Sequence, residues 1–328
     1  MSSNYRGMKK ITREELKIFL KTHNEIVIEE KALPIGQPKT IVEFQPSSFK
    51  LERTNAWSFP DREKWATHAG DFRGNWPPQL VRNIVLRFSK PNELVLDQMC
   101  GSGTTLIECK LLDRNGIGVD INPNSVMLTL DRTGFECKSP ERGPTRTEIE
   151  TCIGDARNLD LINDDNIDLI ATHPPYAGII SYSKNERVAG DLSALRNIDR
   201  YVSAMREIAS ESYRVLRPRR YCAILEGDTR KHRHHVPIAF RVMQAFLDVG
   251  FLLREDIMKN QWRTTATRER WEGLSKTAEE CWIDADEEAK RGRYTDFLLL
   301  YHEHLFVFRK PKQGEDVRKL KYSARWRE

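Results

Sequence analysis

The stretch ELVLDQMCGSGTTLIECKLLDRNGIGVDIN occupies residues 93–122 and decides the class of fold that the chain can adopt. Residues 93–99 and 116–122 carry runs of apolar side chains and read as strands. Residues 104–115, which lie between them, read as a helix. A strand, a helix and a second strand of these lengths predict a parallel β-α-β unit.

The same alternation of strand-like and helical segments continues beyond this unit. Short apolar runs recur at 150–154, 167–171 and 221–226, and helical patterns recur at 198–216 and 236–249. Strands separated by helices of this length predict an α/β chain, in which a mostly parallel sheet carries helices on both faces.

A glycine-rich turn, DQMCGSGTT at 97–105, connects the first strand of the unit to its helix. Glycines let a backbone approach a ligand closely, and the N–H groups at a helix start are free to bind it. The turn is not a dinucleotide fingerprint, because Leu106 stands where a third glycine is needed, nor is it a phosphate loop. Asp97 would repel a phosphate, and it suits a cationic group such as an ammonium.

Two further carboxylates follow later strands. Asp120 lies 19 residues after Gly101, close to the spacing of a carboxylate that binds ribose hydroxyls. Asp155 follows the run at 150–154 and can accept a hydrogen bond from an adenine amino group. Because the carboxyl ends of parallel strands meet at one edge of a sheet, the three acids predict one ligand site. A ligand with ammonium, ribose and adenine parts is S-adenosylmethionine.

The next strand ends in an unusual loop, Thr172-His173-Pro174-Pro175-Tyr176. Proline fixes its own φ, has no N–H to donate and restricts the residue before it. The loop is therefore expected to be stiff and extended, and to lie at the same edge as the three acids. Taken alone, it reads equally well as a strand terminator with a packing tyrosine.

Together, the segments DQMCGSGTT, GVDINP, GDARNL and THPPY resemble the amino-methyltransferase family that acts on DNA. This family transfers methyl from S-adenosylmethionine to an exocyclic base nitrogen, and the resemblance covers roughly residues 68–310. It implies a Rossmann-like class I methyltransferase fold, with a mostly parallel seven-stranded sheet, helices on both faces and an antiparallel last strand. It further implies site-specific methylation of double-stranded DNA, as in restriction-modification, on a base flipped out of the duplex.

The resemblance also carries over site residues. Catalysis is expected from His173, Pro174, Pro175 and Tyr176: a proline carbonyl and the preceding side chain accept from the amino group, and the tyrosine ring stacks on the base. No metal ion is expected to take part. Cofactor contacts are expected from Asp97, Met99, Cys100, Gly101, Gly103, Thr104, Thr105, Asp120, Ile121, Asp155, Ala156 and His173.

His173 departs from the family pattern, which usually has Asp, Asn or Ser at this position. A neutral imidazole can accept one hydrogen bond, whereas an imidazolium can accept none. Thr172 precedes it, as in many cytosine enzymes, and His is bulkier than Ser. These features favour the smaller pyrimidine, so that cytosine N4 is slightly preferred over adenine N6 as the target.

Three parts are expected along the chain: an N-terminal extension at 1–67, a methyltransferase domain at 68–310 and a basic tail at 311–328. The helix predicted at 77–88 and the residues before it are expected to wall the cofactor pocket, with His68, Trp76 and Pro77 as candidates. Within the domain, the charged segment 260–295 reads as a target-recognition insert or as a surface loop. Its candidates for contacting phosphates and bases are Trp262, Arg263, Arg268, Arg270 and Trp271.

Composition narrows the cellular setting. No apolar run approaches the roughly 20 residues of a membrane helix, and the first residues contain no apolar signal segment. The six cysteines form no CxxC pair, which fits reduced thiols better than disulfides or zinc ligands. The formal net charge is +5, and residues 309–328 hold eight Lys or Arg against three Asp or Glu. We expect a protein of the prokaryotic cytoplasm, associated with the nucleoid through DNA.

Other functions stay open at the level of sequence. The same chemistry is used on guanine N2 in RNA and on protein glutamine, although no separate RNA-binding domain is visible. A non-catalytic DNA-binding subunit of the same fold is a further alternative, against which the intact glycine turn and PPY loop count. The family also allows for a cognate restriction nuclease as a partner.

Overall fold

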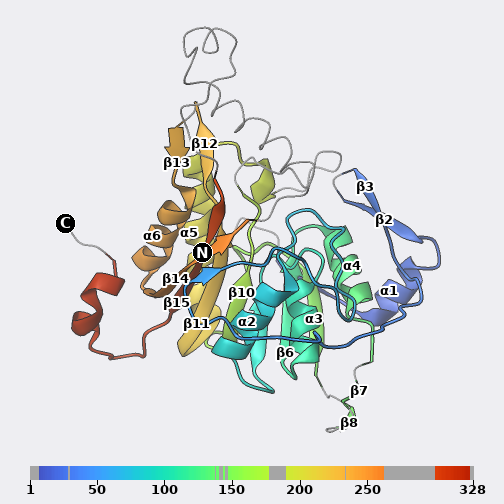
Figure 1. Cartoon of the computed structure of the whole chain (residues 1–328). Helices are drawn as coiled ribbons and strands as arrows, with labels where there is room; N and C mark the ends of the chain where they lie inside the picture. The colour runs from blue at the N-terminus through green and yellow to red at the C-terminus, as the bar shows by residue number, and fades with distance from the viewer. Residues whose placement is uncertain are drawn as a thin grey trace, which may run out of the picture.

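One central sheet organises the chain, and helices cover both of its faces (Figure 1). Among the described residues this sheet has nine strands, in the order β1-β9-β6-β5-β10-β11-β15-β14-β4. The computed structural model describes residues 7–28, 30–136, 147–176, 190–232, 234–261 and 300–325, and the backbone alone at 138–139 and 143–144.

Five neighbouring strands at the centre of the sheet run parallel to one another. Their carboxyl ends therefore lie along one edge, which we call the carboxyl edge. In order across the sheet, these strands are β9 (Ile149–Ile153), β6 (Asn115–Asp120), β5 (Leu94–Asp97), β10 (Ile167–Thr172) and β11 (Leu216–Glu226).

Two long strands complete the core of the sheet beside β11. β15 (His302–Arg309) runs antiparallel to β11, and β14 (Leu252–Asn260) runs antiparallel to β15. A parallel sheet that receives one antiparallel strand next to its last parallel strand is the arrangement of a class I methyltransferase. The predicted fold class is thereby confirmed.

The sheet has two more strands than the seven that the sequence predicted. β1 (Lys9–Ile11) pairs antiparallel with β9 at one edge, and β4 (Ala56–Trp57) pairs parallel with β14 at the other. Both belong to the stretch 1–67 that was expected to precede the domain. The sequence pattern does not predict these two strands, because strands of two or three residues show no periodicity. They form because backbone groups at an open sheet edge still need hydrogen-bond partners.

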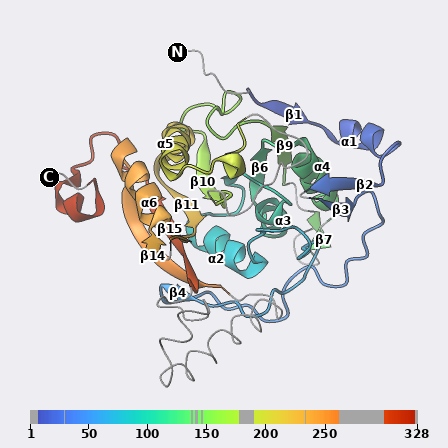
Figure 2. The same ribbon diagram turned by 90° about the horizontal axis from the view of Figure 1, so that it is seen from above.

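Helices lie on both faces of the sheet (Figure 2). The two faces bury different side chains of the same strands. α2 (Pro78–Phe88) and α3 (Thr104–Leu111) cover one face, where Leu169 of β10 is buried. α5 (Ile198–Val215) and α6 (Ile238–Val249) cover the other, where the neighbouring Ile170 is buried. All six residues of β10 are buried, which explains why this central parallel strand is mostly apolar, with Asp168 and Thr172 as its polar residues.

The remaining elements surround this core. α4 (Pro123–Arg132) packs against β6 and β9, and α1 (Arg13–Phe19) packs against α4. Two short helical turns, η1 (Leu192–Ala194) and η2 (Val317–Ser323), follow β10 and β15 in the chain. Three hairpins are formed by β2 (Glu25–Ile28) with β3 (Lys31–Pro34), β7 (Lys138–Ser139) with β8 (Gly143–Pro144), and β12 (Thr229–Lys231) with β13 (His234–Val236).

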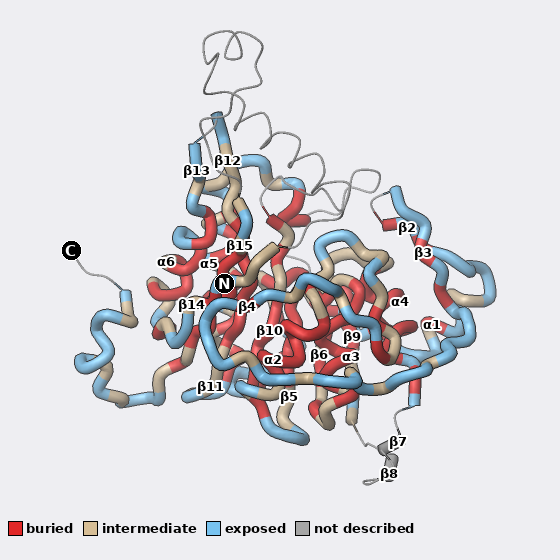
Figure 3. Tube along the Cα trace, in the orientation of Figure 1, coloured by how far each residue is buried: buried red, intermediate tan, exposed pale blue. Residues whose placement is uncertain are grey.

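No helix in the described ranges combines the length and the apolar character that crossing a membrane requires. Burial is concentrated in the layers between the helices and the central sheet, while the chain around them is largely exposed (Figure 3).

Candidate active site

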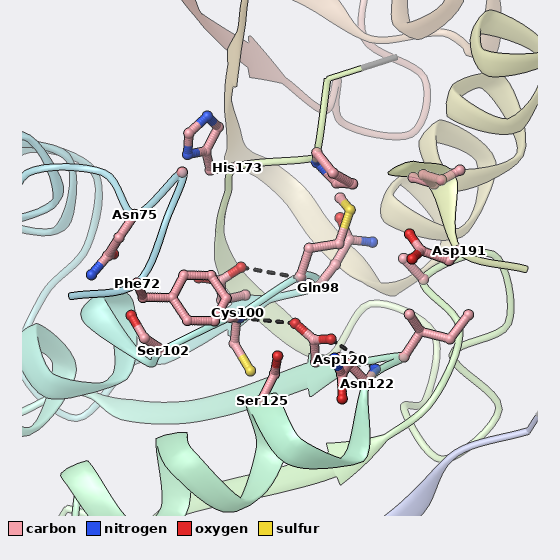
Figure 4. A pocket seen from close by; sticks show the side chains of 18 of the residues that line it. Phe72, Asn75, Gln98, Cys100, Ser102, Asp120, Asn122, Ser125, His173 and Asp191 are labelled. Atoms are coloured by element: carbon pink, nitrogen blue, oxygen red, sulfur yellow. Dashed lines mark hydrogen bonds between the residues drawn. The ribbon is translucent and has the colours of Figure 1, made fainter. Parts of the chain in front are cut away.

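A cavity that opens to solvent lies at the carboxyl edge (Figure 4), and its free space, with the open mouth included, is about 820 Å³. It is bounded by the loops that follow β5, β6, β9 and β10, by the segment before α2 and by the start of η1. Its lining residues are Phe72, Gly74, Asn75, Trp76, Asp97, Gln98, Met99, Cys100, Gly101, Ser102, Asp120, Ile121, Asn122, Ser125, Gly154, Asp155, Ala156, His173, Pro175, Gly190, Asp191 and Leu192.

Asp120 joins the end of β6 to the glycine turn. Its Oδ2 accepts a hydrogen bond from the backbone N–H of Gly101 at 2.9 Å, and its Oδ1 accepts one from the N–H of Asn122 at 2.8 Å. Gly101 has a φ of 51°, in the left-handed region that glycine enters at little cost. Burial nevertheless raises the pKa of the Asp120 carboxyl to about 7, because desolvation outweighs the two backbone donors.

Asp97 occupies the end of β5 and is almost fully buried at the floor of the cavity. Its Oδ2 accepts from the Thr105 hydroxyl at 2.5 Å, and its Oδ1 accepts from the N–H of Met99 at 3.2 Å. Burial raises the pKa of Asp97 to about 6. Because desolvation is the main cause of both raised pKa values, the two acids would ionise fully beside a cationic ligand.

A third acid, Asp155, is held by Arg157. The guanidinium donates to Asp155 through Nε at 2.9 Å and through Nη2 at 2.6 Å, and Nη2 also donates to the carbonyl of Gly190 at 2.7 Å. This contact brings Gly190 and Asp191 to the cavity wall. Asp191 is buried, and its charge contributes to the raised pKa of Asp120.

The hydrogen-bonding groups that line the cavity can be compared with those of a candidate ligand. Four carboxylates line it, and the lining residues of the described chain include no Lys or Arg. Two buried groups facing this region, Gln98 Nε2 and Ser102 Oγ, have no hydrogen-bond partner among the described residues. Acceptors for ammonium and hydroxyl groups, together with spare donors for a carboxylate, fit S-adenosylmethionine, which carries all three groups.

The loop after β10 forms the opposite end of the cavity. The His173 ring stacks on Trp76, with ring centroids 5.7 Å apart and an interplanar angle of 29°. Its Nε2 lies 2.9 Å from the hydroxyl oxygen of Tyr176, which donates to Glu303 at 2.5 Å. Burial lowers the pKa of His173 to about 4, so the ring is neutral at physiological pH.

A family model described as DNA methylase, for N6 and N4 methyltransferases, matches residues 3–130 and 167–326. The chain belongs to this DNA methylase family. The predicted family is thereby confirmed, and S-adenosylmethionine is the cofactor of the family and of its fold.

Individual relatives match shorter segments. The Type II methyltransferase M.Cfr9I of Citrobacter freundii is 33% identical over 75 residues, which are 22% of this chain and 25% of that protein. The tRNA (guanine(10)-N2)-dimethyltransferase of Methanothermobacter thermautotrophicus is 33% identical over 120 residues, 35% of this chain and 32% of that protein. The chain thus spans about a quarter to a third of these relatives.

Among solved structures, an S-adenosylmethionine-dependent methyltransferase of Methanosarcina mazei aligns with 70% of this chain and 97% of its own, at 14% identity and a TM-score of 0.43. This is a likeness of fold alone.

The predicted cofactor residues of the DNA methylase divide into two groups. Nine of them line the cavity: Asp97, Met99, Cys100, Gly101, Asp120, Ile121, Asp155, Ala156 and His173. The other three lie behind it. Thr105 bonds Asp97, Thr104 donates to Asn75 at 2.5 Å, and Gly103 caps α3 with a φ of 84°.

The predicted catalytic residues are also divided. His173 and Pro175 line the cavity, whereas Pro174 and Tyr176 are buried beside it. The Tyr176 ring lies so close to Gly227 that an added Cβ would stand 2.8 Å from it. Its role as a stacking surface for a base stays a prediction.

Of the three predicted wall residues, Trp76 lines the cavity and Pro77 caps α2. His68 lies elsewhere, buried against Glu108 with an Nε2 to Oε1 distance of 2.8 Å. The insert residues Trp262, Arg263, Arg268, Arg270 and Trp271 lie outside the described residues. In the described part of the chain, no group of three or more His, Cys, Asp or Glu side chains could hold a metal ion.

Several lining residues were missed by the sequence reading. Asp191 lies in the GDLS segment at 190–193, between β10 and α5, where no periodic pattern marks its place in the cavity. Ser125 and Asn122 flank the start of α4, where a polar residue reads first as a cap. The other lining residues without a prior assignment are Phe72, Gly74, Asn75, Gln98, Ser102, Gly154, Gly190 and Leu192.

Proposed function

We propose that this protein transfers methyl from S-adenosylmethionine to an exocyclic amino group of a base in double-stranded DNA. The observation that carries the proposal is the meeting of two features at the carboxyl edge. Asp97, Asp120 and Asp155 line one part of a single cavity, and the His-Pro-Pro loop forms another part of it. A methyl donor and an acceptor amino group held there would be adjacent, and positioning of two bound reactants is a large source of rate.

The acids would hold the three polar parts of the cofactor. Asp97 would accept from its ammonium, Asp120 from its ribose hydroxyls and Asp155 from its adenine amino group. The unpartnered donors Gln98 Nε2 and Ser102 Oγ would serve its carboxylate. When bound, S-adenosylmethionine supplies an electrophilic methyl group on a positively charged sulfur.

The loop after β10 would prepare the amino group. The lone pair of an aromatic amine is delocalised into the base, so acceptors on its two N–H bonds favour attack. The carbonyl of Pro174 and the side chain of His173 are the proposed acceptors. His173 suits this role only as a neutral ring, and its pKa of about 4 keeps it neutral at physiological pH.

For the target base, we propose cytosine N4 in preference to adenine N6. The support is size, because the His173 ring and the Trp76 ring stacked on it stand together in the cavity wall. Two rings at this wall leave less room than the smaller residues usual in the family, which favours a pyrimidine.

Basic side chains at the carboxyl edge support DNA as the substrate. β11 ends at this edge, and the hairpin β12–β13 follows it at once. The hairpin exposes Lys231, His232, His234 and His235, in the upper part of Figure 1. Positive charge beside the cavity would attract backbone phosphates, and a base flipped from the duplex would then enter the cavity.

The basic C-terminal tail leaves from the opposite edge. β15 runs antiparallel to β11 and ends at Arg309, which pairs with Tyr221 near the start of the parallel part of β11. The tail is also partly neutralised, since Arg309 contacts Glu315 at 2.6 Å and Arg325 contacts Asp248 at 3.2 Å. These contacts support a packing role for residues 311–325 in place of a DNA-binding one.

A second candidate substrate is guanine N2 in tRNA. The support is the matching segment of the tRNA dimethyltransferase, which is longer than that of M.Cfr9I. The basic hairpin would serve an RNA backbone equally well. The prokaryotic cytoplasm is the setting that we propose for either substrate, whereas a restriction nuclease as partner belongs to the DNA function alone.

One experiment separates these substrates. The purified protein is incubated with labelled S-adenosylmethionine and either duplex DNA or tRNA, and the nucleosides are identified by mass spectrometry. We expect N4-methylcytosine from DNA. N6-methyladenine would overturn the choice of base, and label in tRNA alone would replace the DNA proposal. Sequencing of cellular DNA with and without the gene, by a method that detects modified bases, would then give the recognition site.

A further inference from the structure

A chain of hydrogen bonds connects the catalytic loop to strands β14 and β15. Tyr176 donates its hydroxyl proton to Oε1 of Glu303 at 2.5 Å, and Lys259 donates to Oε2 of the same carboxylate at 2.7 Å. On its other side, the Tyr176 oxygen lies 2.9 Å from Nε2 of His173. Glu303 is 5% exposed and Tyr176 is 9% exposed, so little water competes for these bonds.

Glu303 is ionised within this chain. Burial pushes the pKa of its carboxyl upward, but Lys259, His173 and Tyr176 outweigh burial and leave that pKa lowered. A second buried carboxyl, Glu226 of β11, faces the same region, and burial raises its pKa far above the usual value. Burial thus favours the neutral form of Glu226 over a second buried negative charge beside Glu303.

The number of protons available to Glu303, Tyr176 and His173 then determines which ring nitrogen of His173 carries a hydrogen. An ionised carboxylate accepts only, and tyrosine has a single proton to donate. Because that proton points to Glu303, the Tyr176 oxygen offers lone pairs to His173, and Nε2 must carry a hydrogen. A neutral imidazole has one N–H, so its Nδ1 keeps a lone pair.

One contact opposes this arrangement. The backbone of Gly74 accepts a hydrogen bond from the ring and favours a proton on His173. On the Nε2 side, however, the bonds lead to an ionised carboxylate, and charge-assisted hydrogen bonds are roughly twice as strong as neutral ones. The charged side decides the tautomer as long as Glu303 stays ionised.

We propose that Glu303 is a positioning residue of the methyl transfer, which fixes His173 through Tyr176 as the Nε2–H tautomer and leaves Nδ1 as the only acceptor of the ring. The proposal deepens the proposed function, since this acceptor would serve the target amino group. Lys259 takes part by holding Glu303 in its ionised form.

Histidine tautomers can be read from ¹⁵N chemical shifts, independently of any activity. The protein is labelled with ¹⁵N-histidine, and His173→Gln identifies the signals of this ring. The wild type is expected to show His173 with a proton on Nε2 at pH 7.5. In Glu303→Gln, the amide can donate to Tyr176, whose proton then turns to Nε2 of His173. The tautomer is expected to switch to Nδ1–H.

Glu226→Gln is the matched control. Glu226 is also a fully buried glutamate beside Tyr176, but its partner is the hydroxyl of Tyr201, at 3.0 Å. Its replacement is expected to leave the His173 tautomer unchanged. A wild-type ring with its proton on Nδ1, or the same tautomer in wild type and Glu303→Gln, would overturn the proposal.

Lys259 provides a second test that keeps Glu303 in place. Without the ammonium, the pKa of Glu303 rises, and a protonated Glu303 would donate to Tyr176. In Lys259→Met, the tautomer is therefore expected to change from Nε2–H to Nδ1–H as pH falls from about 8 to about 5. Lys259→Arg is expected to behave as the wild type. A tautomer independent of pH in Lys259→Met would count against the proposal.

Kinetics connect the tautomer to the reaction. Glu303→Gln is expected to lower kcat by about tenfold or more, toward the lower end of the roughly 10²–10⁴-fold effect of a group that transfers the proton itself, because Glu303 acts through Tyr176. The Kd for S-adenosylmethionine should stay within twofold of wild type, because Glu303 does not line the cavity. An unchanged kcat would overturn the positioning role. If wild type methylates no nucleic acid while the tautomers behave as expected, the proposed function fails and the assignment of Glu303 as tautomer-setting residue stands.

Discussion

The carboxylate of Asp120 accepts a hydrogen bond from the backbone N–H of Gly101, so the end of β6 and the glycine turn after β5 form one unit. This bond fixes the turn while the carboxylate keeps further lone pairs for a ligand. It also places a half-buried acid, with a pKa of about 7, in the wall of the cavity.

Replacing Asp120 should weaken the cofactor site. Hydrogen bonds to charged groups contribute roughly 1.5–3 kcal/mol each, so Asp120→Ala should weaken S-adenosylmethionine binding by about tenfold or more. Calorimetric titration measures the effect, and Asp164→Ala, at an exposed acid away from the cavity, is the control. Binding equal to that of the wild type would remove Asp120 from the cofactor site.

The affinity for S-adenosylmethionine should depend on pH. In the empty site, Asp120 takes up a proton as pH falls through about 7, and Asp97 takes one up near pH 6. A protonated acid is a weaker partner for hydroxyls and for a cation, so affinity should fall from pH 8 to pH 5.5. Titrations in two buffers of different ionisation enthalpy should show proton release on binding near pH 6.5. Binding with neither pH dependence nor proton release would contradict both raised pKa values.

The raised pKa of Asp120 also affects the folding stability of the ligand-free protein. The folded pKa of Asp120 lies above its unfolded value, so the contribution of this group is fully present near pH 4 and is lost as pH rises through about 7. The substitution Asp120→Asn removes this loss of stability with rising pH, because the amide does not ionise. At pH 8 the variant should unfold at a higher temperature than the ligand-free wild type, and near pH 4 the two should coincide. A variant less stable at pH 8 would show that the carboxylate is needed for folding.

The pH–rate profile should reflect the desolvation of the His173 ring. With a pKa of about 4, this ring keeps its lone pair down to about pH 5, whereas an exposed histidine would lose it near 6.5. At saturating S-adenosylmethionine and DNA, kcat should therefore show no limb near pH 6.5 and should fall only below about pH 5. A limb centred on pH 6.5 that disappears in His173→Asn would show that the ring is not desolvated during turnover.

Two basic regions offer a matched comparison of DNA contacts. Arg230→Gln with Lys231→Gln alters the hairpin at the carboxyl edge, and Lys319→Gln with Lys321→Gln removes equal charge from the tail. The hairpin variant should reduce the slope of log affinity against log salt by about 1 to 2, and the tail variant should leave it unchanged. Fluorescence anisotropy with a duplex of fixed sequence measures both. The reverse pattern would place the DNA on the other edge.

Much of this protein follows from its sequence. The apolar runs at 94–97, 115–120 and 167–172 lie at the centre of the sheet, and a strand buried on both faces has no alternative to such a pattern. The acids after these strands reach one cavity because parallel strands share a carboxyl edge. The two glycines of the turn also fit the structure, since Gly101 and Gly103 adopt positive φ values that residues with a side chain disfavour.

Tertiary structure alone decided the rest. Edge strands β1 and β4 form because backbone N–H and C=O groups at the edges of the central sheet need hydrogen-bond partners. Strands of two or three residues are too short for a sequence pattern to predict them. Asp191 reaches the cavity through Arg157, whose contact with Gly190 no local rule predicts. The neutrality of His173, and the route by which Glu303 and Lys259 reach it, depend on burial and on tertiary contacts, such as the bond from Tyr176 to Glu303, 127 positions later in the chain. Spacing along the chain can place a titratable residue at a strand end, but only the packed surroundings set its charge.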